Sequence, residues 1–237
     1  DTTPEGEQVN IYGNHVGSWN FAATAYLNRW KVKIYYEHYF DDHSQMFFQY
    51  GRWKDGHIGL EITFPKNRFI DTFVYEGLGT KDQTGPMLYD SFWGEFEEQI
   101  SAKDNYYNHY LYQGWQHWGM GIGNPLLPGP IYNKNGQITF ISNRVLAHHI
   151  GFCGSPCQSL SYRMLLSYSR HWGTYDNPLN EIKKQFNSLF EVTYAPQQLK
   201  GWSFTVSGAM DRGNLLGNNY GGMLVIRKQG IIKSGNK

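Results

Sequence analysis

Hydrophobic and polar residues alternate along two long runs near the start of this 237-residue chain. In residues 17–27 the alternate positions on one side are Trp19, Phe21, Ala23, Ala25 and Leu27. Residues 30–40 alternate more sharply, because Lys31, Lys33 and Glu37 fall opposite the hydrophobic positions. Alternation of this kind is typical of β-strands with two unlike faces. Each run is about 11 residues long, the length of a tilted strand that spans a membrane.

Seven further runs complete a predicted set of about nine strands. They are residues 57–64, 68–78, 137–152, 159–172, 188–195, 201–211 and 220–229. The sequence shows no helical stripe longer than about two turns and no repeat of fixed period. It therefore predicts an all-β protein built from antiparallel strands.

The predicted connections between strands alternate in length. The short ones are residues 28–29, 65–67, 152–158 and 196–200, and the long ones are 41–56, 79–136, 173–187 and 212–219. Outer-membrane β-barrels have short periplasmic turns and longer extracellular loops, whereas soluble sandwiches have no reason to follow this rule. The pattern predicts a transmembrane antiparallel β-barrel with long extracellular loops, formed as one domain over residues 1–237.

The strand count leads to a second expectation. If the last strand runs towards the periplasm, the first strand does too, and residues 1–16 lie outside the cell. Bacterial barrels have an even number of strands, and open sheet edges do not occur in lipid. We therefore expect the nine strands to be the C-terminal part of a larger barrel, whose N-terminal part is missing from this sequence.

The longest predicted connection, residues 79–136, contains an aromatic stretch at 103–133. Tyr and Trp alternate there with Asn, Gln and His, with almost no charge after Asp104, and Gly and Pro interrupt its second half. Such aromatic residues bury much apolar surface when they pack, so we expect a folded insertion, either extracellular or inside the lumen. The candidate glycan-binding residues are Asn105, Tyr106, Tyr107, Asn108, Tyr110, Trp115, His117 and Trp118. Their rings would stack on sugars and their polar groups would bond hydroxyls; alternatively, they only pack the loop into the barrel mouth.

Composition narrows the classes of function. The formal net charge of +1 implies no polyanionic partner, so nucleic acid is not expected. Aromatic residues make up 17% of the chain and charged residues 17%, against about a quarter charged in ordinary soluble domains. This balance fits a sugar-binding surface or the aromatic girdles of a membrane barrel. The absence of an apolar run of about 18 residues excludes a transmembrane helix.

Charged residues recur on the predicted strands. Lys31, Lys33, Glu37 and Arg163 are expected to face a polar lumen, whereas Arg170 falls on the opposite face and fits only at the membrane rim. Glu76 with Asp82 or Asp104 could form a glycosidase pair, but a solvated loop or an internal salt bridge is favoured.

No metal, cofactor or catalytic residue is predicted. His148 and His149 are adjacent strand residues that point to opposite faces, so they do not form a ligand set. Cys153 and Cys157 flank Gly154 and Pro156 and are predicted to close a disulfide at a turn, as suits the periplasm. Free thiols and a metal site are the alternatives.

Several segments resemble the capsule assembly Wzi family, particularly its longer members from Bacteroidota. They are residues 14–21, 30–42, 74–86, 104–127, 131–152 and 169–178, with a weaker similarity at 221–228. The resemblance implies an outer-membrane barrel of roughly eighteen strands, of which this chain is the C-terminal half. It also implies a non-enzymatic role in capsule or exopolysaccharide attachment at the cell surface. It assigns no sugar-contact residue to this chain.

The expected function is therefore surface polysaccharide binding or assembly by an outer-membrane β-barrel, without catalysis. The expected partners are surface polysaccharide, outer-membrane lipid and other outer-membrane proteins. Two alternatives remain: a structural or accessory subunit of a larger outer-membrane complex, and a soluble all-β glycan-active enzyme.

Overall fold

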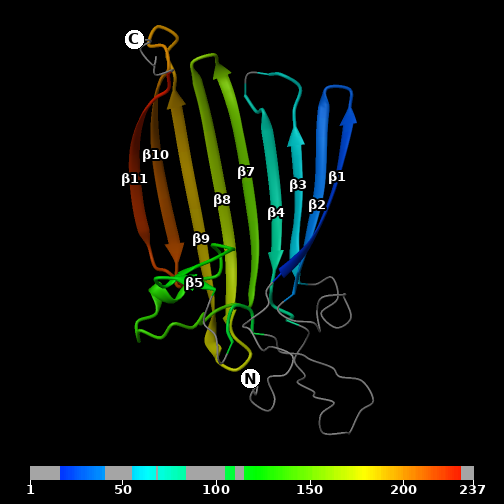
Figure 1. The fold of residues 1–237 in the computed structure, drawn as a ribbon, viewed down its shortest axis with the longest axis vertical. Coiled ribbons are helices and arrows are strands. Elements are labelled where there is room, and N and C mark those ends of the chain that lie inside the picture. The colour runs from blue at the N-terminus through cyan, green and yellow to red at the C-terminus, as the bar shows by residue number, and fades with distance from the viewer. Residues whose placement is uncertain (1–16, 41–54, 68, 84–104, 110–114, 231–237) are drawn as a thin grey trace, which may run out of the picture.

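The computed structural model describes residues 17–40, 55–67, 69–83, 105–109 and 115–230. In them, nine strands form one antiparallel sheet in the order β1-β2-β3-β4-β7-β8-β9-β10-β11 (Figure 1). The strands are β1 (Gly17–Leu27), β2 (Trp30–Phe40), β3 (Gly56–Thr63), β4 (Thr72–Gly79), β7 (Val145–Cys157), β8 (Leu160–Gly173), β9 (Pro178–Tyr194), β10 (Trp202–Gly213) and β11 (Asn219–Lys228). The predicted all-β class and the nine antiparallel strands are confirmed.

Three smaller elements lie between β4 and β7. β5 (Gln116–His117) and β6 (Met120–Gly121) form a separate two-stranded sheet, and η2 (Pro130–Tyr132) is a single 3₁₀ turn. None of the helical segments in the described part of the chain is long and apolar enough to cross a membrane.

The first hairpin matches its prediction at both ends. Asn28 occupies the left-handed region at φ 57° in the two-residue turn between Leu27 and Trp30. Asn tolerates this conformation, which also matches the twist of the flanking strands.

The predicted long connection at residues 173–187 is wrong. β9 begins at Pro178 and pairs with both neighbours, so the connection between β8 and β9 is only residues 174–177. The polar residues of 180–187 belong to a strand rather than to a loop, because the β8–β9 hairpin extends past the other strands (Figure 1). Residues 195–201, between β9 and β10, form a longer connection than residues 174–177 before them or residues 214–218 after them. The predicted alternation of short and long connections therefore fails towards the C-terminus.

The predicted cysteine turn at residues 152–158 is also wrong. β7 continues to Cys157, and the turn follows at residues 158–159. A register shift between Gly154 and Cys157 accommodates Pro156, which is tolerated at a bulge. Both cysteines are free, so the predicted disulfide is not formed. Residues four apart in a regular strand are about 13 Å apart, beyond the roughly 7 Å limit for a disulfide.

The strand register separates the sheet into two unlike faces. The polar face carries Lys33, Glu37, His57, Glu76, His149, Ser167, Asn187 and Asp211. The apolar face carries Trp19, Phe21, Ile34, Ile58, Ile150, Leu166, Phe190, Val206 and Leu224. Much of the apolar face is exposed: Ile34 is 54% exposed and Leu224 65%.

The charged strand residues lie where the sequence places them. Lys31, Lys33, Glu37 and Arg163 are on the polar face, and Glu191 pairs with Arg163 at 3.3 Å. Arg170 lies on the apolar face, close to the end of β8, where its guanidinium stacks on Trp172 at 5.4 Å.

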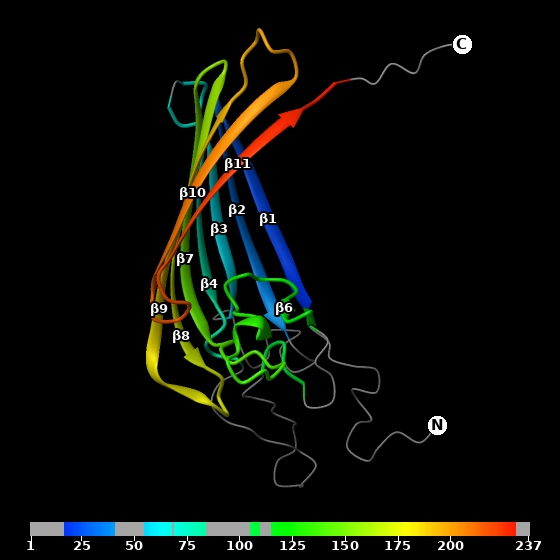
Figure 2. The same cartoon turned by 90° about the vertical axis from the view of Figure 1, so that its left-hand side faces the viewer.

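The sheet is curved and open. Figure 2 shows its strands bending into a trough, with β1 at one edge and β11 at the other. In the described ranges, no strand pairs with the outer edge of β1 or of β11.

The described part of the predicted insertion fills one end of the trough (Figures 1 and 2). Residues 137–144, which were predicted as the start of a strand, belong to this irregular part, because β7 begins only at Val145. We call residues 105–109 and 115–144 the plug. Leu127 and Phe140 of the plug pack with Val145 against Leu78 and Ala147, whose side chains are on the polar face. The polar face is therefore the concave one, and the main buried hydrophobic cluster lies between it and the plug.

Candidate functional site

A buried carboxylate ties the plug to the sheet. Asp55 is 0% exposed and accepts a hydrogen bond from the backbone N–H of Asp82 at 2.8 Å and another from that of Gln83. The hydroxyl of Tyr106 donates to the same carboxylate at 3.0 Å. Burial raises the pKa of Asp55 to about 6, although these donors act to lower it. Asp55 thus joins the start of β3, the loop after β4 and the first described plug segment.

Asparagine side chains hold the plug together internally. Asn108 donates to the carbonyl of Phe140 at 2.8 Å and accepts from the N–H of Phe140 at 2.8 Å. The Asn143 amide donates to Asn105 Oδ1 and to the carbonyl of Tyr106, the latter at 2.9 Å. The Asn108 amide both donates and accepts, and the Asn143 amide donates twice, so these side chains replace part of the missing backbone ladder of an irregular segment.

Aromatic rings form the interior of the plug. The Tyr107 ring lies 5.0 Å from that of Phe140 and 6.3 Å from that of Trp115, measured between centroids. Tyr106 is only 3% exposed. Among the candidate glycan-binding residues, Tyr106, Tyr107 and Trp115 are therefore packed inside the plug.

A groove of about 1060 Å³ separates the plug from the β8–β9 turn. It is lined by Asn105, Asn108, His109, Gly136, Gln137, Ile138, Thr139, Phe140, Ile141, Thr174, Asn177, Pro178 and Leu179. None of these lining residues is Asp, Glu, Lys or Arg. Amide and hydroxyl groups beside the exposed Ile138 and Ile141 side chains create a mixed polar and apolar surface, which is typical of small-ligand sites.

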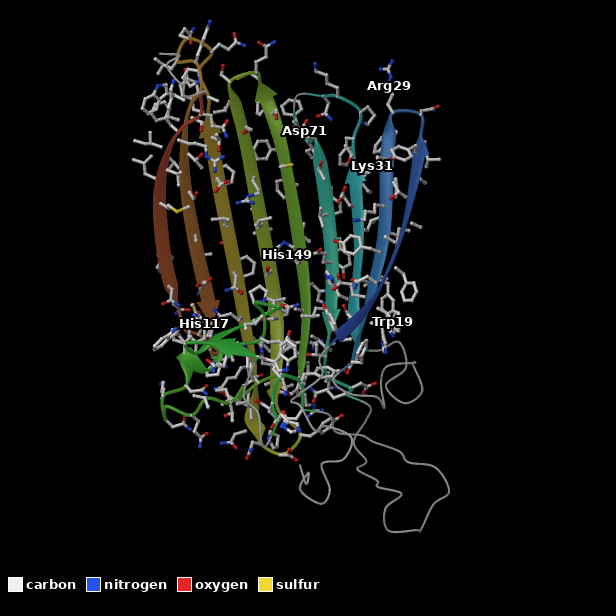
Figure 3. The ribbon with its side chains drawn as sticks, in the orientation of Figure 1. Trp19, Arg29, Lys31, Asp71, His117 and His149 are labelled. Carbon is white, nitrogen blue, oxygen red and sulfur yellow. The ribbon has the colours of Figure 1, made fainter. Side chains whose placement is uncertain are left out.

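His117 and Trp118 do not line this groove. His117 and Trp118 lie at the tip of the β5–β6 hairpin, where the two rings meet edge to face at 6.2 Å (Figure 3 labels His117). Both are exposed. Tyr110 lies outside the described residues. The structure therefore divides the seven described candidates into groove-lining asparagines, packed aromatics and an exposed hairpin tip.

The β8–β9 turn is attached to the loop after β4. The Tyr175 hydroxyl donates to the carbonyl of Asp82 at 2.9 Å, and the guanidinium of Arg144 lies 3.7 Å from the Tyr175 ring centroid. Arg144 also donates to the carbonyl of Lys81 at 3.1 Å. These contacts fix one wall of the groove relative to the sheet.

A second polar cluster lies on the sheet beneath the plug. His57 Nδ1 is 3.7 Å from Glu37, and His57 Nε2 is 3.6 Å from Glu76. The hydroxyl of Tyr35 donates to Glu76. Glu76 therefore has a histidine and a tyrosine as partners, as in the predicted internal salt bridge. Asp104, the other residue proposed for a glycosidase pair, lies outside the described residues.

The two adjacent histidines of β7 point to opposite faces, as predicted. His149 Nδ1 is 2.6 Å from Ser167 Oγ on the polar face. His148 Nδ1 is 2.8 Å from the Tyr75 hydroxyl on the apolar face. In the described ranges, no three His, Cys, Asp or Glu residues come together as a metal site.

Several residues of the site were missed in the sequence. They are Asp55, Gln83, Asn143 and Asn177. The segment of Asn143 was predicted as a strand, and the segments of the other three were predicted as loops. Asp55 directly precedes the Gly56 that opens β3, and a polar residue before a strand is a common loop residue. Its burial depends on contacts with residues that are at least 27 positions away in the sequence, such as Asp82.

Comparison with protein-family models and with curated proteins finds no match to this chain. The site is therefore interpreted from its own geometry.

Proposed function

We propose that this chain forms part of the wall of an outer-membrane β-barrel, and that its plug binds surface polysaccharide without catalysis. The observation that carries the proposal is the separation of the two sheet faces. In the paired rows of strand residues, the apolar face has no Asp or Glu, and its charged side chains are Arg170, Lys184, Arg212 and Lys228. Arg170, Arg212 and Lys228 are close to strand ends, and Lys184 pairs with Arg170 where β9 extends past β10.

The exposure of the apolar face supports a lipid environment. Water would contact Phe21, Ile34 and Leu224, each more than half exposed, along a single continuous sheet surface. Soluble proteins rarely leave an apolar surface of that extent uncovered, whereas the outward face of a membrane barrel is apolar throughout. This argues against the soluble glycan-active enzyme.

Aromatic pairs border the apolar face at both ends. At the end of the sheet that carries the plug, which we call the loop end, the rings of Trp19 and Phe40 lie 6.5 Å apart. At the opposite end, which carries the β1–β2 turn and which we call the turn end, those of Trp30 and Phe64 lie 5.0 Å apart. Trp202 stacks on Phe204 at the turn end of β10. Tryptophan and tyrosine favour the water–membrane boundary because their rings are apolar with one polar group, and barrels carry such girdles at both interfaces.

The groove supports a neutral class of ligand. Its described lining residues carry amide and hydroxyl groups and no carboxylate, ammonium or guanidinium group, so they suit a neutral polysaccharide better than an acidic one. The segment resemblance to the capsule assembly Wzi family supports a polysaccharide ligand at the cell surface.

The first test uses the native full-length protein. In the proposed barrel, the outer-membrane fraction contains a band that shifts on heating, and capsular polysaccharide purified from the same cells binds the detergent-extracted protein. Replacing the groove residue Asn177 with Ala should weaken this binding by roughly fivefold, about the effect of one neutral hydrogen bond. Gln197→Ala, in the turn at the opposite end of the sheet, is the matched control and should bind normally.

Two results would refute the proposal. A soluble protein with no heat-dependent shift rules out the barrel. A heat-shifted protein that does not bind polysaccharide, but purifies with stable protein partners, supports the structural-subunit alternative.

A further inference from the structure

We propose that an apolar patch on the plug is the docking surface for the strands that complete the barrel wall. The inference rests on the proposed barrel and adds a contact between the plug and the other side of that wall. The patch consists of Trp118, Met120, Ile122, Ile131 and Tyr132, each at least half exposed.

The tip of the patch is a strained and rigidly held tryptophan. Trp118 at φ 52° and Gly119 at φ 80° are the two central residues of the β5–β6 hairpin, whose two positive φ angles match a type I′ turn. The left-handed region costs a bulky residue roughly 1–2 kcal/mol, and Trp118 is nevertheless 85% exposed. Backbone strain of this kind is concentrated where a side chain serves a contact.

Surrounding contacts prevent the hairpin from relaxing. Gln116 Oε1 accepts from the N–H of Gly119 at 2.7 Å, and the N–H of Ile131 donates to the carbonyl of Gly119 at 2.7 Å. Gly129 lies so close to β6 that a Cβ there would be 2.5 Å from the backbone nitrogen of Gly121. The indole is therefore presented on a fixed support.

The chemistry of the patch differs from that of the groove. Its other members are a thioether, two isoleucines and one tyrosine, without a charged side chain or an amide. An exposed apolar patch of this composition suits apolar side chains of another protein surface rather than sugar hydroxyls. In Figure 2, β5 and β6 stand within the concavity, apart from the wall formed by β9, β10 and β11.

The composition of the two edge strands indicates which protein surface contacts the patch. Natural edge strands are protected by Lys, Pro or bulges, yet β1 has no charged residue or proline, and β11 is charged only at Arg227 and Lys228. Both edges therefore have the composition of strands that have a neighbour on each side.

Strand direction then excludes a second copy as that neighbour. Nine antiparallel strands make β1 and β11 run in the same direction. Two copies related by a twofold axis along the barrel would join β1 of one to β11 of the other in parallel. A fully antiparallel wall needs an odd number of added strands, which also makes the total even. We assign them to a further segment of the same polypeptide, with apolar side chains directed at the patch.

Cysteine accessibility in the full-length protein tests this contact. Single cysteines are placed at Trp118 (Trp118→Cys) or Tyr132 (Tyr132→Cys) in a background with Cys153→Ser and Cys157→Ser. Asn177→Cys in the open groove is the accessible control. In detergent-extracted protein that still shows the heat shift, a polyethylene-glycol maleimide should label the two patch positions at least tenfold more slowly than position 177. After heat unfolding all three should react alike.

Each other outcome overturns the inference in a recognisable way. Labelling of both patch positions at the rate of position 177, with the heat shift retained, shows an open patch while the barrel stands. Protection that appears only after capsular polysaccharide is added makes the patch a glycan platform. Protection that is lost on dilution indicates a second copy. Loss of the heat shift in the unmodified protein refutes the barrel itself.

Discussion

At the scale of single residues, polar side chains hold the plug together and attach it to the sheet. The carboxylate of Asp55 and the amide of Asn108 each bond backbone groups of segments far away in sequence. An unsatisfied buried backbone group costs about 1–3 kcal/mol, so each of these side chains compensates for the irregular backbone around it. This explains how a stretch rich in Asn and Tyr folds with only one short hairpin, β5–β6, in its described part.

Asp55 should make plug stability depend on pH. Its folded pKa of about 6 lies above the ordinary value of 3.8, so the folded state takes up the proton first as pH falls. The stabilisation is fully present below pH about 4 and is lost as pH rises through about 6. Hydrogen exchange of plug amides, corrected for intrinsic pH effects, should show a larger opening free energy at pH 5 than at pH 7, by on the order of 1–3 kcal/mol. An unchanged pH profile in Asp55→Asn would contradict this.

Asn108→Ala should destabilise the plug by roughly 1–3 kcal/mol, because both backbone groups of Phe140 lose their partner inside the protein. Limited proteolysis should then cut the plug faster while the heat shift of the sheet is retained. Asn135→Ala is a milder control, since its side chain accepts only the exposed N–H of Gln137. Equal cleavage rates for the two variants would show that the Asn108 pair is unimportant.

At the scale of elements, the plug is assembled by close backbone contact as well as by side chains. Glycines at positions 119, 121 and 129 let the β5–β6 hairpin lie directly on the segment that leads into η2. Any other residue would place a Cβ atom in this space, so the position of the hairpin depends on these glycines having no side chain.

Gly129→Ala should displace the hairpin, because the new methyl would meet the backbone of Gly121 at 2.5 Å and that of Gly119 at 2.7 Å. Overpacking of this kind typically costs 1–3 kcal/mol. The expected result is faster proteolysis at residues 116–132. Gly208→Ala in β10 is the matched control, since a Cβ there meets nothing within 4 Å. Resistance to protease equal to that of the unmodified protein would show that the segment has room to adjust.

At the scale of the whole molecule, the two faces of the sheet should respond oppositely to charge. Ala22 and Ala23 are neighbours in β1, both exposed, with Ala22 paired to Tyr35 on the polar face and Ala23 to Ile34 on the apolar face. Ala23→Arg should cost about 2–4 kcal/mol in lipid and reduce the heat-shifted fraction, whereas Ala22→Arg should assemble normally. Equal assembly of both variants would argue against a lipid-facing surface.

Much of the sheet could be predicted from the sequence, because strand alternation is a local property. Residues 17–40 were predicted with correct strand ends, since Asn28 and Arg29 separate two sharply alternating runs. Residues 178–187 were not, because their polar side chains look like a loop until β8 and β10 are found on either side. Cys153 and Cys157 suggested a turn, yet a bulge allows the strand to pass through Pro156.

The sequence by itself determined the all-β class, the nine strands and which residues share a face, since these follow from the two-residue period of a strand. It also marked the aromatic insertion as a folded segment. Only the tertiary structure decided which of the insertion's residues pack, which line the groove and which stand exposed. These outcomes depend on contacts such as Asp55 with Tyr106, and Tyr175 with Asp82, which join residues distant in sequence. No local pattern encodes such contacts, because they form only when the sheet brings its loops to one end.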